Sequence, residues 1–138
     1  MPTIPAPLTT NYPVWFTVLI VEDDEAVRTM IVAFLMNLGV KNLLIAKNAV
    51  EAKDAFKRIV IHLIISDHDL GPDAEGLTQE NGEMILGMVK KEHPHTARLL
   101  VSGNPLNFEK TEHPHLGKPF TLQSLSPVVQ DAFEKADA

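Results

Sequence analysis

The stretch LIISD at residues 63–67 decides how the rest of this sequence is interpreted. It is an apolar run that stops abruptly at a carboxylate. An almost continuously apolar run of this length is typical of a strand that is covered on both faces, as in a parallel sheet. We therefore predict a strand over residues 61–66, with Asp67 at its carboxyl end.

Two other stretches have the same form. VLIV at 18–21 runs into acidic residues, and LLV at 99–101 runs into a serine. These runs predict strands over residues 15–21 and 98–101. Shorter apolar segments predict a strand over 42–46 and a weak strand at 115–116.

Segments with helical spacing of apolar residues alternate with these strands. One begins at Asp23 or Asp24 as N-cap and ends at Gly39, and a second is capped by Asn48. A third covers about 81–91. The last covers about 122–135, with Pro127 as a point where this helix could bend or begin late. Strands that alternate with helices predict βαβ units, a parallel sheet and helices on both of its faces.

Composition limits the classes of protein. The chain has 138 residues, 45% of them hydrophobic, which suits a single domain with a core. Residues 1–13 carry four prolines and are predicted to form an extended tail, so the domain covers 14–138. The absence of Cys excludes disulfides and thiolate metal sites and fits a reducing compartment.

Charge and hydropathy exclude two kinds of partner. The net charge is -6 and no cluster of Lys or Arg occurs, so no nucleic-acid partner is expected. No apolar run approaches the roughly 18 residues that span a membrane, and the N-terminus lacks the features of a secretory signal. We expect a cytoplasmic protein.

Reactive groups follow the predicted strands. They are the carboxylates of Glu22, Asp23 and Asp67, the hydroxyl of Ser102 and the ammonium of Lys118. In open parallel sheets such groups gather beyond the carboxyl ends of the strands. Carboxylates that lie together need a cation or a raised pKa, and Mg²⁺ prefers oxygen ligands. A carboxylate can also attack phosphorus, with Mg²⁺, a lysine and a hydroxyl holding the phosphoryl oxygens.

Four blocks of sequence, in the same order, resemble those of the response-regulator receiver (CheY-like) domain of two-component signalling. They are VLIVEDDE at 18–25, LIISD at 63–67, LLVSG at 99–103 and GKPF at 117–120. The resemblance covers residues 15 to about 135. It implies a flavodoxin-like, doubly wound sheet of five parallel strands in the order 2-1-3-4-5.

The resemblance also implies roles for individual residues. Asp67 would be the phosphoacceptor. Glu22 and Asp23 would be the acidic pair that holds Mg²⁺, with Asp23 as a direct ligand and Glu22 acting mainly through water. Asp67 and the backbone carbonyl of Asp69 would complete the protein ligands.

The remaining implied roles fall after the fourth predicted strand. Ser102 would bind a phosphoryl oxygen when the domain switches, and Lys118 would pair with the phosphoryl group. In this family the peptide bond at the position of Lys118–Pro119 is often cis. His115 lies where many receivers carry an aromatic switch residue, and the alternative is a partly exposed histidine with no such role.

Two segments depart from the family pattern. The loop after Asp67 is long, since Gly82 opens the third helix fifteen positions later, and residues 70–81 are either a surface insertion or a partner-specific lid. The segment 103–114 is short, so we expect a shortened or irregular fourth helix and an altered partner surface. The tetrapeptide EHPH at 92–95 and 112–115 leaves a histidine-based metal site as an alternative.

These features predict a stand-alone receiver that accepts a phosphoryl group from a histidine kinase or phosphotransfer protein and then binds a protein target. It is expected to be a signalling phosphoacceptor rather than an enzyme, and a monomer or weak dimer. Three alternatives stay open: a phosphorylation-independent interaction module, a receiver excised from a hybrid histidine kinase, and a metal-dependent phosphohydrolase with Asp69 as its general acid.

Overall fold

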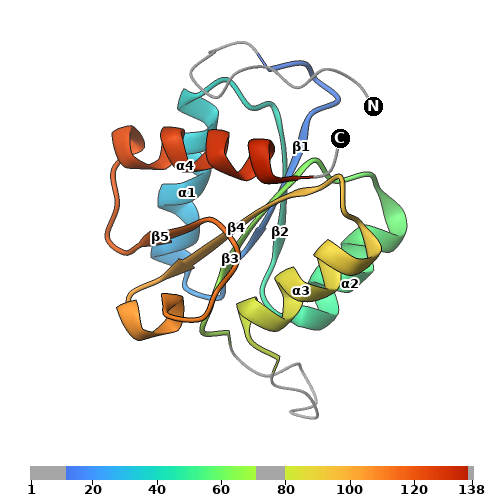
Figure 1. The fold of residues 1–138 in the computed structure, drawn as a ribbon. Helices are drawn as coiled ribbons and strands as arrows, with labels where there is room; N and C mark the ends of the chain where they lie inside the picture. The colour runs from blue at the N-terminus through green and yellow to red at the C-terminus, as the bar shows by residue number, and fades with distance from the viewer. Residues whose placement is uncertain (1–11, 71–79, 137–138) are drawn as a thin grey trace.

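The computed structural model describes residues 12–70 and 80–136, and the predicted parallel sheet is present (Figure 1). Its five strands lie in the order β2-β1-β3-β4-β5, and every neighbouring pair is parallel. The strands are β1 (Thr17–Val21), β2 (Asn42–Ala46), β3 (Leu63–Asp67), β4 (Ala97–Ser102) and β5 (His115–Gly117). The predicted fold class and strand order are confirmed.

Four α-helices cover the two faces of the sheet in the described part of the chain. They are α1 (Glu25–Asn37), α2 (Ala49–Arg58), α3 (Gly82–Glu92) and α4 (Leu122–Lys135). Figure 1 shows α1 and α4 on one face and α2 and α3 on the other. None of these helices is long and apolar enough to cross a membrane.

The central strands are apolar throughout because both of their faces are covered. Side chains alternate along a strand, so Val18 and Ile20 join the core beneath α1 and α4. Leu19 and Val21 join the core beneath α2 and α3. Each of these side chains is fully buried. A parallel sheet with helices on both faces therefore explains the continuous run that the sequence shows.

Side chains at the helix N-termini fix where the helices begin. The carboxylate of Asp24 accepts hydrogen bonds from the backbone of α1, which decides between the two predicted caps. Asn48 caps α2 and Asn81 caps α3 in the same way. Helix α4 begins at Leu122 behind a capping box, so Pro127 lies inside the helix and does not mark a late start.

The segment between β4 and β5 contains no α-helix. Its one helical element is a 3-10 turn, η1 (Pro105–Phe108), capped by the side chain of Asn104. The prediction of a shortened or irregular helix in this segment is confirmed. Ser102 and Lys118 are too close in the chain for a full helix plus a return to the sheet edge.

Residue Tyr12 corrects one detail of the predicted tail. Only 1% of it is exposed, and its ring stacks on Phe16 with centroids 4.7 Å apart. An aromatic ring gains by leaving water, so the chain packs against the domain from Tyr12 onward. Residues 1–11 of the predicted tail, and residues 71–79 of the long loop, lie outside the described residues.

Candidate functional site

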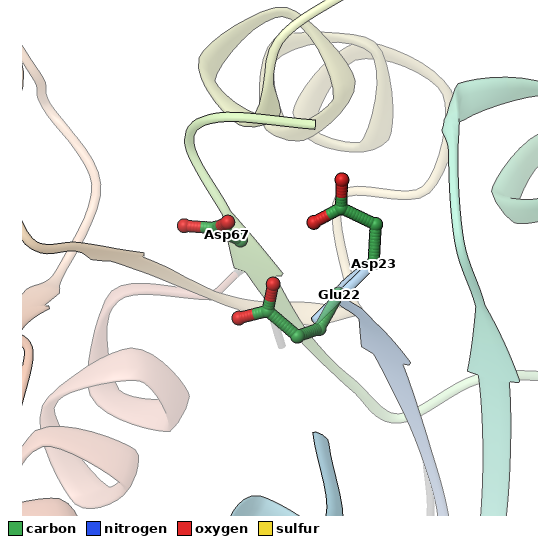
Figure 2. Close-up of side chains that lie close together, drawn as sticks. All are labelled: Glu22, Asp23 and Asp67. Carbon is green, nitrogen blue, oxygen red and sulfur yellow. The ribbon is translucent and has the colours of Figure 1, made fainter. Parts of the chain in front are cut away.

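Three carboxylates meet at the carboxyl ends of β1 and β3. Glu22 and Asp23 directly follow β1, and Asp67 is the last residue of β3. Strand register sets this arrangement. Val21 pairs with Ser66, so the residues that follow them, Glu22 and Asp67, lie side by side. One carboxylate oxygen from each side chain lies within 4.8 Å of the others (Figure 2).

The three carboxylates differ in exposure. Glu22 is 1% exposed and Asp67 is 7% exposed, whereas Asp23 lies at the surface. Two buried carboxylates beside each other repel, and this arrangement needs positive charge nearby. The open side of the cluster is the side of Asp23.

Lys118 supplies that positive charge from the turn after β5. Its ammonium donates to Glu22 Oε1 at 2.8 Å and lies 3.1 Å from Asp67 Oδ1. The backbone N–H of Lys118 donates to the carbonyl of Ser102, which ties this turn to the end of β4. The Lys118–Pro119 peptide bond is cis, as the resemblance implied.

Burial and charge shift the proton affinities within the cluster. Burial raises the pKa of Glu22 to about 7, and the neighbouring Asp67 acts in the same direction, while the bond to Lys118 opposes both. Burial also disfavours the charge of Lys118, but its hydrogen bonds to Glu22 and Asp67 outweigh burial and raise its pKa. Lys118 is therefore a permanent cation at neutral pH.

Two further groups, which the sequence did not indicate, hold Glu22 in place. The guanidinium of Arg28 donates to the backbone carbonyl of Glu22 at 3.1 Å. The backbone N–H of Asp24 donates to Glu22 Oε2 at 3.3 Å. Both come from the start of α1, so the helix that covers the sheet also orients the acidic pair.

Gly82 packs directly against the backbone of Asp67. A Cβ at position 82 would overlap the carbonyl oxygen of Asp67 and would lie 2.9 Å from Ser66 Oγ. The N–H of Gly82 donates to the carbonyl of His68 at 2.8 Å, and the N–H of His68 donates to Val101. The start of α3 therefore fixes the carboxyl end of β3, and only glycine allows this close approach.

Ser102 ends β4, and its hydroxyl is hydrogen-bonded to residues of the segment that follows the strand. Its side chain is buried, and Oγ accepts from the N–H of Asn104 at 3.0 Å and from Asn107 Nδ2 at 2.7 Å. The hydroxyl donates to the carbonyl of Asn104 at 3.3 Å. The sequence identified Ser102 but gave no sign of Asn107, because a bond across five residues of irregular chain follows no periodic pattern.

The other predicted site residues lie further out. The side chain of Asp69 is exposed and pairs with His68 Nδ1 at 2.9 Å, and the proposed role of its backbone carbonyl stays a prediction. His115 is exposed, donates from Nδ1 to the carbonyl of His113 at 3.1 Å, and stacks on Phe108. The long stretch at 71–79, predicted as an insertion or a lid, lies outside the described residues.

The donor atoms suit a hard divalent cation. Among the described residues, Glu22, Asp23 and Asp67 form the one group of three or more acidic or histidine side chains whose ligand atoms converge. All donors are carboxylate oxygens, which Mg²⁺ prefers as ligands. Asp23 is exposed to water, and a bound Mg²⁺ keeps several water molecules among its ligands. The histidine-based alternative finds no such support: His93 stacks on Phe56, and His113 pairs with Glu83.

Comparison with known proteins identifies the fold. No protein-family model and no curated protein sequence matches this chain. The solved structures of receiver domains do match. The signal receiver domain of an HD domain-containing protein from Pseudomonas fluorescens Pf-5 is 24% identical over 90% of each chain, with a TM-score of 0.74.

Two further matches come from different sources. The receiver domain of a sensor histidine kinase from Pseudomonas aeruginosa PAO1, which has a magnesium ion in its active-site cleft, is 20% identical. It covers 86% of this chain and 98% of its own, with a TM-score of 0.69. A CheY-like receiver domain protein from Methanospirillum hungatei JF-1 is 22% identical over 86% of this chain and 94% of its own, with a TM-score of 0.68.

At identities below 25% these likenesses concern the arrangement of the backbone, and they agree with the strand order and with the helices on both faces of the sheet. The chain has the fold of a response-regulator receiver domain.

Proposed function

We propose that this chain is a receiver that accepts a phosphoryl group on Asp67 from a histidine kinase or a phosphotransfer protein, and that its phosphorylated form binds a protein target. One observation carries the proposal. The Asp67 carboxylate lies 3.1 Å from the Lys118 ammonium and within reach of two further acidic side chains, at the end of a central strand.

The transfer needs a nucleophile and positive charge around the moving group. A carboxylate oxygen of Asp67 attacks the phosphorus of a phosphohistidine; the new P–O bond forms while the P–N bond breaks, and the imidazole leaves with that electron pair. The phosphoryl oxygens carry negative charge in the transition state, so donors around them lower the barrier. The ammonium of Lys118, 3.1 Å from Asp67 Oδ1, supports the proposal that it is one of these donors.

Three carboxylates facing one ammonium leave the site with excess negative charge. A phosphoryl group adds to that excess. Mg²⁺ held by Glu22, Asp23 and Asp67 would neutralise it and would orient the phosphoryl oxygens for in-line attack. The exposed position of Asp23 supports entry of the ion from water.

A phosphodonor assay tests the proposal. The protein is incubated with acetyl phosphate and Mg²⁺, and its mass is measured before and after treatment with hydroxylamine, which cleaves acyl phosphates. We expect a gain of one phosphoryl group. Hydroxylamine should remove this group, and EDTA, added before acetyl phosphate, should prevent the gain. The Asp67→Asn variant should gain none, and the surface variant Asp54→Asn should behave like the wild type. No gain in the wild type, or an equal gain in Asp67→Asn, would contradict the proposal.

We further propose that the chain acts as a stoichiometric phosphoacceptor and is not a turnover enzyme. Cytoplasmic location, the monomeric or weakly dimeric state, the absence of a nucleic-acid partner and the unnamed protein target stay predictions from the sequence. A receiver that is part of a longer hybrid kinase would use the same chemistry at Asp67.

One observation favours a second candidate, a phosphorylation-independent interaction module. The segment between β4 and β5 has a 3-10 turn in place of a helix, and Ser102 is bonded into this turn. A partner that binds the fixed surface of this segment would not need Asp67 to be phosphorylated. Equal partner binding with and without beryllofluoride, which mimics an acyl phosphate, would favour this candidate over the first.

A further inference from the structure

Ser66 places a hydroxyl in the apolar core beneath α2 and α3. Side chains alternate along β3, so Ser66 lies on the same face as Ile64 and on the opposite face from Asp67. Ser66 is 0% exposed. A hydroxyl that is buried among apolar side chains costs free energy unless it makes a hydrogen bond. This hydroxyl donates to the backbone carbonyl of Asp67 at 3.0 Å, so its one printed bond is to the residue at the end of the strand.

The hydroxyl restrains one peptide unit, the one that joins Asp67 to His68. The N–H of this unit belongs to His68 and donates to the carbonyl of Val101 on β4 at 2.8 Å. The C=O of the same unit belongs to Asp67 and accepts from Ser66. On the other side of β3, the pairing with β1 ends one residue earlier, at Val21 and Ser66. The hydroxyl therefore holds a peptide at the end of the sheet, where β1 no longer pairs with β3.

Helix α3 encloses this hydrogen bond. Gly82, the first residue of α3, lies so close that a Cβ there would overlap the Asp67 carbonyl and would lie 2.9 Å from Ser66 Oγ. Asp67 is 7% exposed and Ser66 is buried, so water cannot readily replace the hydroxyl. If the hydroxyl were removed, a buried carbonyl would lose a donor, and its peptide would be free to rotate.

The orientation of this peptide affects the carboxylate, because the peptide carbonyl and the side chain are attached to the same Cα of Asp67. A peptide that is held at its N–H and at its C=O also fixes the direction of the Cα–Cβ bond. The carboxylate at the end of that side chain lies 3.1 Å from the Lys118 ammonium, and Figure 2 shows it beside Glu22. Rotation of the peptide would therefore move the carboxylate within the acidic cluster.

We propose that Ser66 is a positioning residue for the phosphoacceptor: its hydroxyl fixes the backbone of Asp67 and so keeps the carboxylate aligned with the phosphorus of the donor. The inference rests on the proposed phosphoacceptor function. Ser66 faces the opposite side of the sheet, so it acts only through the backbone of Asp67. A displacement of about 1 Å can slow a reaction about a hundredfold, so one buried hydrogen bond behind the nucleophile is enough to change the rate.

The rate of acyl-phosphate formation tests the inference. Each protein is incubated with acetyl phosphate at saturating Mg²⁺, and its gain in mass is followed over time. Ser66→Val and Ser66→Thr fill nearly the same volume, but only threonine keeps the hydroxyl. Ser66→Val should therefore react about tenfold more slowly than Ser66→Thr, the size of one buried hydrogen bond, and Ser66→Ala about tenfold more slowly than the wild type. Phosphoramidate as donor should give the same ratios, because the displaced group belongs to the protein.

Thr96→Val separates positioning from a general loss of stability. Thr96 is buried near the opposite end of β3, and its hydroxyl donates to the backbone carbonyl of Ile61 at 2.7 Å. This variant removes a hydrogen bond of the same kind, far from the acidic cluster. Its melting temperature should fall, but its rate of acyl-phosphate formation should equal that of the wild type. Thermal unfolding of every variant verifies that it is folded at the temperature of the assay.

The possible outcomes are distinct. Equal rates in Ser66→Val and Ser66→Thr, or a wild-type rate in Ser66→Ala, overturn the inference and leave the phosphoacceptor proposal standing. Equal slowing in Thr96→Val and Ser66→Val does the same, because loss of stability would then explain both. A wild type that gains no phosphoryl group overturns both proposals. If Ser66→Val does not fold, Ser66→Ala and the wild type supply the comparison.

Discussion

Two regions at the same edge of the sheet differ in how they are held in place. The first, which we call the acidic site, consists of Glu22, Asp23, Asp67 and Lys118, and ion pairs and strand register hold it together. The second, the 103–114 segment, contains one 3-10 turn, and its Asn107 donates to Ser102, whose carbonyl accepts from the backbone N–H of Lys118. The chemistry of phosphoryl transfer and the surface that would report it are therefore built by separate parts of the chain.

The difference follows from how each region is positioned. The acidic site lies at strand ends, where the register of backbone pairing fixes which residues are neighbours. The 103–114 segment is a connection, and connections tolerate changes of length and sequence because few backbone bonds depend on them. A chain can therefore keep the chemistry at Asp67 while the surface that would bind a partner in response to phosphorylation changes.

The largest effect should come from the glycine that supports the acidic site. Gly82→Ala places a Cβ against the carbonyl of Asp67, so either α3 or the end of β3 must move. We expect the free energy of unfolding to fall by about 3 kcal/mol, as measured by urea denaturation. Acyl-phosphate formation should slow as well, because the carboxylate moves with its backbone.

The same helix offers a matched control. Gly87 is exposed in the middle of α3, and a Cβ there would meet nothing within 4 Å. Gly87→Ala should raise the free energy of unfolding by up to about 1 kcal/mol, because alanine favours helix more than glycine does. Equal effects of the two substitutions would show that Gly82 has no special relation to Asp67.

A smaller effect is expected at the cation of the acidic site. Lys118→Met removes the ammonium that competes with Mg²⁺ for Glu22 and Asp67. Mg²⁺ should bind about tenfold more tightly, since one positive charge is removed from beside its ligands. Phosphorylation by acetyl phosphate should nevertheless slow, because a donor to the phosphoryl oxygens is lost. Isothermal titration measures the first change, and mass spectrometry the second.

Lys90→Met is the control for that variant. Lys90 pairs with Glu112 at the surface of the 103–114 segment, and both side chains are exposed. Its removal should change neither Mg²⁺ affinity nor phosphorylation. Weaker Mg²⁺ binding in Lys118→Met would contradict the view that the ammonium and the metal ion compete for the same carboxylates.

The smallest effect concerns a buried histidine of the 103–114 segment. Burial lowers the pKa of His113, and Arg98 and Lys90 act in the same direction, against the opposing charges of Glu83 and Glu112. The folded state thus favours the neutral ring. The contribution of neutral His113 to the free energy of unfolding is therefore fully present above the unfolded pKa of about 6.5. This contribution is lost as the pH falls below that value, because the unfolded state then takes up a proton more readily than the folded state.

The His113→Gln variant tests this linkage. Glutamine can still donate to Glu83 but cannot take up a proton, so its free energy of unfolding should fall less than that of the wild type between about pH 7.5 and pH 5.5. Urea denaturation at the two pH values gives both slopes. Equal slopes would mean that His113 does not couple the 103–114 segment to pH.

The same contrast explains what the sequence could predict. Apolar periodicity located the five strands and four α-helices, because both faces of the sheet are covered and leave a clear pattern. The carboxylates and Lys118 could be placed together because parallel strands end at one edge. Their roles could be assigned only through the resemblance to receiver domains, since an Asp that follows a strand is common in itself.

Contacts without periodicity could not be predicted. The bond from Asn107 to Ser102 and the pair of His113 with Glu83 join positions whose relation depends on an irregular turn. The prolines around Tyr12 predict a tail at this position, whereas the burial of Tyr12 depends on Phe16 and on the core beyond it. Tertiary packing overrides local composition at such positions.

The central claim is that Asp67 carries the phosphoryl group. Its most direct test is to phosphorylate the protein with acetyl phosphate and Mg²⁺, reduce the acyl phosphate with borohydride, and sequence the peptides by mass spectrometry. Reduction converts a phosphorylated aspartate to homoserine. We expect homoserine at position 67 and unmodified aspartate at position 23. Homoserine at another position, or at none, would contradict it.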